Sequence, residues 1–145
     1  MGNKEFIPNS TQIPNILLDH LLPRVSLADR MCLLYICRRT FGFHKDEDRI
    51  SFSQFINGIK DRNGKVLDRG TGLSRPAISE ALGYLVKSGA VFVQKSFRGN
   101  VYKINLEMDV EEVVKQLNQL RYLTKTSKAA LPKQVKLFNS QNIGK

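Results

Sequence analysis

Hydrophobic residues recur at helical spacing through the first forty residues of the chain. They predict a short helix between Pro14 and Pro23 and a second helix from Ser26 to about Thr40. Ser26 can cap the second helix, with Asp29 three residues on as a short-chain variant of the capping box. This second segment is apolar nearly all round, so we expect it to lie at the centre of the core.

The most informative pattern lies in the second half of the chain. Ser74 is a good N-cap, Pro76 sits in the first turn where its missing N–H costs nothing, and Gly89 supplies a left-handed stop. Apolar residues between them share one helical face: Ile78, Ala81, Leu82, Leu85 and Val86. Two β-rich runs follow, 91–97 and 101–106, joined by a turn that carries Arg98. A capped helix followed at once by a small hairpin with a cationic tip is typical of a winged helix, a fold that usually binds DNA.

A helix-turn-helix is expected to lead into this segment. Ile50–Phe52 predicts a short first strand that pairs with the wing, and residues 53–58 predict a brief capped helix ending at Gly58. The connection from residue 59 to residue 71 exceeds the usual turn of three or four residues. It contains Asn63-Gly64, a strong hairpin signal.

The basic residues of this insert leave two interpretations open. These residues are Lys60, Arg62, Lys65 and Arg69. The insert is either a second basic finger on DNA or a solvated loop, since Asp61 and Asp68 offset half of its charge. We favour the solvated loop, because charged loops are common on protein surfaces.

A further amphipathic helix is expected at residues 107–124, after a winged-helix domain at 8–106. Asp109 can cap it, and one apolar stripe follows: Val110, Val113, Val114, Leu117, Leu120 and Leu123. This stripe either packs on its own domain or forms a two-fold contact in a homodimer, which would place two reading helices on paired half-sites. Residues 125–145 are then expected to form a basic flexible tail.

Length and composition fit one domain of modest size. The 145 residues are 41% hydrophobic, which is enough for a core, and the expected fold is mainly α with a small β wing. Nothing resembles a signal peptide, and the longest apolar run, Met31–Cys37, is too short to span a bilayer. We therefore expect a cytoplasmic protein of a prokaryotic cytosol or nucleoid, with no membrane partner. Cys32 and Cys37 are expected to be reduced and buried.

Charge indicates a polyanionic partner. The chain carries a net charge of +10, and residues 51–106 hold nine basic but three acidic residues. The excess gathers around the expected reading helix and wing, where it would attract nucleic acid. The N-terminal half of such a helix contacts base edges in the major groove. The residues expected to bind double-stranded DNA are Ser74, Arg75, Pro76, Ser79, Glu80, Gly83, Lys87, Arg98, Asn100 and Lys103.

No catalytic arrangement is visible in the sequence. The chain has two histidines, His20 and His44, and no Ser/His/acid or metal-binding set has a sensible spacing. Gly70-Thr71-Gly72 lacks the Lys-Ser/Thr ending of a P-loop. We expect no enzyme activity, no metal site and no cofactor.

Four blocks of sequence occur in a characteristic order: Thr11–Asn15, Arg38–Lys45, Asp48–Phe55 and Gly72–Arg75. With these blocks the chain resembles the N-terminal domain of bacteriophage replication protein O over roughly residues 8 to 106. The resemblance implies a winged helix that binds repeated sites in a replication origin. In that family a separate C-terminal region recruits the helicase-loading machinery, so a helicase or helicase loader would bind through regions not in this chain. The long insert departs from the family pattern.

Three functions follow from these observations. The resemblance implies an origin-binding replication initiator, whereas a transcriptional regulator would use the same fold and reading mode. A primosome interaction module would dock protein through its winged helix instead of DNA. The charge around the helix and wing argues against this third function, and only the resemblance separates the first two. We therefore expect an initiator.

Overall fold

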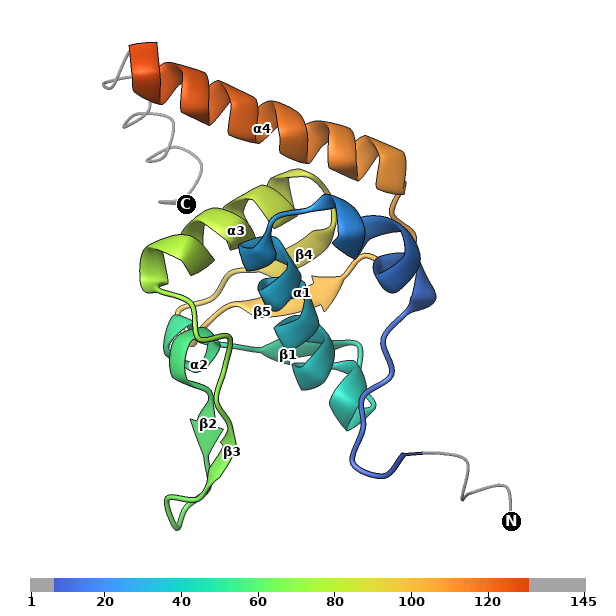
Figure 1. The fold of residues 1–145 in the computed structure, drawn as a ribbon. Coiled ribbons are helices and arrows are strands. Elements are labelled where there is room, and N and C mark those ends of the chain that lie inside the picture. The colour runs from blue at the N-terminus through green and yellow to red at the C-terminus, as the bar shows by residue number, and fades with distance from the viewer. Residues whose placement is uncertain (1–6, 131–145) are drawn as a thin grey trace.

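The computed structural model of the protein describes residues 7–130. A small sheet and the surrounding helices form a winged helix-turn-helix with an added C-terminal helix, as predicted (Figure 1). In chain order the elements are a π-helical turn (Leu17–Leu21), a 3₁₀ turn (Leu22–Arg24), α1 (Leu27–Arg39), a 3₁₀ turn (Phe41–Phe43), β1 (Glu47–Arg49), α2 (Phe52–Asn57), β2 (Ile59–Lys60), β3 (Val66–Asp68), α3 (Arg75–Lys87), β4 (Val91–Gln94), β5 (Val101–Ile104) and α4 (Val110–Ala130).

The core lies between the helices and one face of an antiparallel sheet. The strand order is β1-β5-β4, and β4 and β5 form the wing. The Phe55 ring packs edge-on against Tyr102 from the sheet, with ring centroids 5.3 Å apart, and tilted against Tyr35 of α1 at 5.5 Å. Cys32 and Cys37 of α1 are buried and unpaired, as predicted, and burial raises the pKa of each thiol to about 12.

The capping signals of α1 and α3 were correct in position. The Ser74 side chain accepts a hydrogen bond from the backbone N–H of Ala77 and opens α3, and Gly89 after this helix has a φ of 89°. Ser26 caps α1 by accepting from the N–H of Asp29. The second hydrogen bond of the predicted capping box, from the Ser26 N–H to the Asp29 side chain, does not form. The Asp29 carboxylate binds the distant Arg121 instead.

The first strand is not where the sequence placed it. The prediction of Ile50–Phe52 was wrong, since the strand β1 covers the charged residues Glu47–Arg49 and pairs with β5. Ser51 starts α2 through a full capping box with Gln54, which turns the chain into a helix at Phe52. The cap therefore precedes the predicted start of this helix by two residues. The two wing strands also end earlier than predicted, at residues 94 and 104.

The insert leaves the two helices of the helix-turn-helix in contact. Both the backbone N–H and the hydroxyl of Thr71 donate to the carbonyl of Phe55 at 2.7 Å, so the chain returns to the end of α2 before α3 begins. Between these points β2 and β3 form the predicted hairpin around Asn63-Gly64, where Gly64 has a φ of 85°. The hairpin projects from α2 away from α4 (Figure 1).

The stripe of α4 packs on its own domain. Val113, Val114 and Leu117 are buried, Leu120 packs against the core, and Leu123 remains 54% exposed. The apolar stripe that could alternatively have formed a homodimer contact is therefore largely used within the domain. The helix continues to Ala130, beyond the boundary predicted at 124, and residues 131–145 of the expected tail lie outside the described residues.

Two ion pairs of different burial hold α4 to the N-terminal helices. Arg121 donates to both carboxylate oxygens of Asp29 at 2.8 Å, and Asp29 is fully buried. Arg121 also lies over the ring of Tyr84 in α3, 4.8 Å from its centroid. Arg24 pairs with Glu111 at 2.8 and 2.9 Å on the exposed surface.

We expect these two pairs to differ sharply in their contribution to stability. Arg121→Met leaves the Asp29 carboxylate buried without its partner, which should lower the free energy of unfolding by about 3 kcal/mol. Urea unfolding followed by circular dichroism measures this change. The matched control Arg24→Met removes an exposed pair, and the unfolding midpoint should barely move. Equal shifts for the two variants would contradict this assignment.

Candidate nucleic-acid interface

One face of α3 remains open after the helix has packed into the domain. Ile78, Ala81, Leu82 and Leu85 turn inward, as their spacing predicts. The opposite face consists of exposed or half-buried residues, most of them small or polar: Pro76, Ser79, Glu80, Gly83 and Lys87. Five of the residues expected to bind DNA therefore share one outward surface.

This surface is flanked by α4 on one side and by the wing on the other. On one side Tyr84 donates a hydrogen bond to the hydroxyl of Thr124 at 2.7 Å, which fixes α4 along α3. On the other side a groove separates α3 from the wing, and both elements contribute to its lining, which includes Ser79, Gly83, Lys87, Lys95 and Asn100. Partial burial lowers the pKa of the Lys87 ammonium.

Arg75 lies at the start of α3, beside this groove. Its guanidinium group stacks over the ring of Phe52 in α2, 5.3 Å from the centroid. The exposed Ser74 at the preceding position uses its hydroxyl oxygen to cap the helix. The first turn of α3 therefore presents a pre-oriented cation next to the small side chain of Ser79.

The wing brings only part of its predicted residues to this surface. Arg98 is exposed at the tip and Asn100 faces the groove. Lys103 does not join them, because residues alternate along β5 and Lys103 points to the opposite face of the sheet, in a hollow with Phe92 and Glu107. The sequence prediction treated the wing as one surface and ignored this alternation.

Three residues near the groove were missed by sequence reasoning. Lys95, the residue after β4, lines the same α3-facing groove as Val93, a position that strand alternation would have indicated. Arg49 in β1 lies against the wing turn, where a Cβ on Gly99 would be 3.3 Å from its Cγ. No local pattern predicts that contact, which depends on the pairing of β1 with β5. Phe97 at the wing tip is 95% exposed.

The acidic residues of the β2–β3 hairpin are occupied within the hairpin and at its base. Asp61 accepts hydrogen bonds from the backbone N–H groups of Asn63 and Lys65 at 2.8 and 2.9 Å. Asp68 accepts from the N–H of Gly70 at 2.8 Å and from the hydroxyl of Tyr35. The four basic side chains all point outward and make no ion pair within residues 7–130: Lys60, Arg62, Lys65 and Arg69.

Two glycines hold the base of this hairpin closely against α2. Gly58 has a φ of 82°, and a Cβ there would lie 2.0 Å from the carbonyl oxygen of Asp68. A Cβ on Gly70 would lie 2.7 Å from the backbone nitrogen of Gly58. No side chain fits at either position without moving the backbone, so the hairpin is seated directly on the helix-turn-helix.

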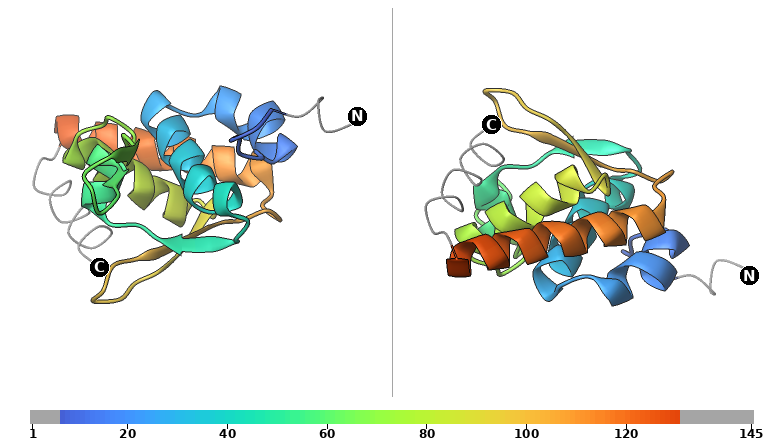
Figure 2. Two further views of the ribbon diagram at one scale, coloured as in Figure 1. Left: turned by 90° about the horizontal axis from the view of Figure 1, so that it is seen from below. Right: turned by 90° about the horizontal axis from the view of Figure 1, so that it is seen from above.

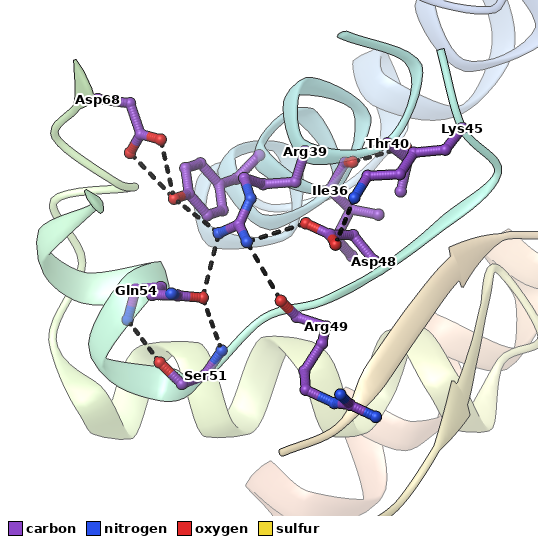
Figure 3. A network of polar contacts seen from close by, with 10 residues as sticks. Ile36, Arg39, Thr40, Lys45, Asp48, Arg49, Ser51, Gln54 and Asp68 are labelled. Atoms are coloured by element: carbon purple, nitrogen blue, oxygen red, sulfur yellow. Dashed lines mark hydrogen bonds and ion pairs between the residues drawn. The ribbon is translucent and has the colours of Figure 1, made fainter. Parts of the chain in front are cut away.

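A buried arginine joins the elements around the interface. The Arg39 guanidinium group pairs with Asp48 of β1 at 2.9 Å and donates to the Gln54 side chain of α2 at 3.2 Å. It also donates to the backbone carbonyl of Arg49 at 3.2 Å. Figure 3 shows Arg39 at the centre of these contacts, with Ser51 and Asp68 at the edges of the network. The Tyr35 hydroxyl lies 3.4 Å from Arg39 and extends the network to the hairpin.

Comparison with known proteins identifies the family. A family model described as "Bacteriophage replication protein O" matches residues 8–112, which is more than half of the chain. No curated protein and no solved structure matched the chain. Within residues 7–130, no helix is long and apolar enough to cross a membrane. No three His, Cys, Asp or Glu side chains of this same segment come together as metal ligands would.

Removal of one hydroxyl should loosen the hairpin while leaving the core intact. Tyr35→Phe deletes the hydrogen bond to Asp68 and should lower the free energy of unfolding by about 1 kcal/mol. Amide hydrogen exchange should become faster at residues 58–70, including the Gly70 N–H that donates to Asp68. Tyr84→Phe, which deletes a hydroxyl contact to α4 instead, is the matched control. Unchanged exchange in the hairpin of Tyr35→Phe would show that the glycines alone hold it.

Proposed function

Because the chain belongs to the bacteriophage replication protein O family, we propose that it binds specific sites in double-stranded DNA at a phage replication origin. Membership of the family places the chain in phage DNA replication. In this proposal α3 reads base edges in the major groove, and the wing contacts the backbone and the minor groove beside it.

The open face of α3 carries this proposal. Ser79 and Gly83 are small, so the helix can approach a duplex closely, while Arg75 at its N-terminal end can reach a base edge. The groove beside α3 is lined by Lys87 and Lys95, which suits a phosphate backbone.

We assign the β2–β3 hairpin to a second contact with the same DNA. Its two acids keep their charge but are hydrogen-bonded within the protein, and its four exposed cations outnumber them, which leaves the hairpin a net charge of +2. Its glycine-packed base fixes where the cations stand relative to α3. A loop that only solvates the surface needs neither feature.

An initiator and a regulator place different demands on DNA. An initiator loads several copies side by side next to duplex that opens easily, whereas a regulator needs one or two operators at a promoter. We propose the initiator, and the family membership supports it. A helicase or helicase loader would join the complex through regions outside this chain.

Selection of fragments from the source genome tests the proposal. The immobilised protein should recover a few adjacent repeats spaced near whole turns, roughly 10–10.5 base pairs, beside an A·T-rich tract with flexible TA steps. Sequencing of the bound fragments measures this. Single scattered promoter sites would favour a transcriptional regulator, and no enrichment over random fragments would overturn specific DNA binding.

Arg75 should contribute to specificity as well as to affinity. If its guanidinium group pairs with a guanine, Arg75→Ala should weaken binding to the selected site by about 1–3 kcal/mol and relax the preference at one base pair. Binding to specific and random duplexes is compared by fluorescence anisotropy. Arg38→Ala, which removes an exposed arginine stacked on Phe43, is the control and should have no effect. Equal losses on both duplexes would reduce Arg75 to a phosphate contact.

The hairpin should contribute affinity that depends on salt. The double variant R62A/K65A removes two exposed cations, so the slope of log K against log salt should fall by about two units. The control K115A removes a cation from the exposed side of α4 and should leave the slope nearly unchanged. An unchanged slope in the hairpin variant would return this segment to the role of a solvated loop.

A further inference from the structure

The wing ends in a phenylalanine that has no place in the core. Phe97 is 95% exposed, more than any other large hydrophobic residue of the described chain. A single exposed apolar side chain is common on protein surfaces and indicates nothing by itself. The surroundings of Phe97 indicate a binding role, because they are ordered, cationic and continuous with the groove beside α3.

The turn that carries Phe97 is ordered by hydrogen bonds. The Gly99 N–H donates to the carbonyl of Ser96 at 3.1 Å, and the Ser96 hydroxyl donates to the carbonyl of Gly99 at 2.7 Å. The N–H of Arg98 donates to the same hydroxyl at 3.3 Å. Phe97 and Arg98 therefore occupy the two central positions of a closed four-residue turn, where both side chains project from the tip.

One cation lies beside the ring of Phe97 and two others flank the turn that carries it. The Arg98 guanidinium group lies 5.8 Å from the ring centroid, and the exposed Lys95 precedes the turn. Arg49 lies against Gly99 from the neighbouring strand. An aromatic ring beside an arginine, on a turn flanked by further cations, suits a partner that offers phosphates and stacked bases together. The patch is continuous with the α3 groove, since Lys95 belongs to both.

The wing extends beyond the body of the protein on the side where α2 lies, away from the N-terminal helices (Figure 2). In the proposed complex, with α3 in the major groove, the wing tip would lie over the neighbouring minor groove. Apolar side chains that enter a minor groove separate adjacent base pairs and kink the duplex by roughly 20–90°. Arginine beside such a wedge is attracted by the phosphates on both edges of the groove.

We propose that Phe97 is a wedge that inserts between base pairs in the minor groove and unstacks them, with Arg98 and Lys95 holding the flanking phosphates. This inference rests on the proposed DNA binding and adds an activity to it, local deformation of the duplex. Flexible pyrimidine–purine steps such as TA are the ones that open most readily, so the wedge selects them beside the site that α3 reads.

The test uses the full chain and duplexes that carry a site recovered by genomic selection. The adenine analogue 2-aminopurine replaces single adenines along the site, and its fluorescence rises when it leaves the stack. Wild-type protein should give a several-fold rise at one step beside the α3 contact, and energy transfer between end labels should report a bend. Phe97→Ala should abolish both signals while affinity falls by about tenfold or less.

Two variants control for other effects. Phe97→Leu keeps an apolar wedge and should retain part of the fluorescence signal. Phe92→Ala removes another phenylalanine, 52% exposed on the opposite face of the sheet, and should leave both signals unchanged. Equal signals from wild type and Phe97→Ala would overturn the wedge and leave the proposed function standing.

Two further outcomes also count against the wedge. Absence of any specific binding by the wild type would remove the proposed function and the wedge with it. Binding to phosphatidylserine vesicles that depends on Phe97, without unstacking of DNA, would assign the ring to a membrane surface and overturn the wedge alone.

Discussion

The arrangement of the interface depends on one buried cation. Arg39 enters from the end of α1, the central helix, and its guanidinium group binds a carboxylate from β1, a side chain from α2 and a main-chain carbonyl. Burial of a charge is unfavourable unless partners occupy its hydrogen-bonding positions, so these elements are held where they can satisfy it. The wing pairs with β1 and the hairpin is seated on α2. Arg39 therefore fixes the positions of both projections relative to each other.

Charge is distributed between two roles in this small domain. Several acidic side chains near the interface form turns and a buried pair, as with Asp61, Asp68 and Asp48, whereas Glu80 is exposed on the open face of α3. Most of the cations near α3 stay at the surface. The hydrogen-bonded carboxylates still count in the net charge of +10, but the exposed side chains that a polyanion would meet around α3 are mostly cationic. Arg121 is an exception on the cationic side, since it is committed to Asp29.

Signals that act over a few residues predicted the fold well, while contacts between distant segments escaped them. Ser74, Gly89 and Asn63-Gly64 each specify their own turn or cap, and each stands where the sequence placed it. The first strand was misplaced because Glu47–Arg49 has no apolar pattern and becomes a strand only by pairing with residues 101–103. The residues of the candidate site divide in the same way, into those that local patterns predicted and those that depend on distant contacts. Helical periodicity predicted the outward face of α3. The approach of Arg49 to the wing, and the position of Lys103 on the opposite face of the sheet, could be known only once the strand pairing was known.

The closed base of the β2–β3 hairpin makes the length of this arm independent of the rest of the domain. Thr71 binds the carbonyl of Phe55 directly, and Gly58 and Gly70 touch, so the chain leaves and re-enters the helix-turn-helix at one place. Whatever lies between the two glycines is a loop closed by the native fold, and a longer or shorter one changes its closure entropy only slowly. The arm can therefore be lengthened, shortened or recharged without altering how the two helices meet.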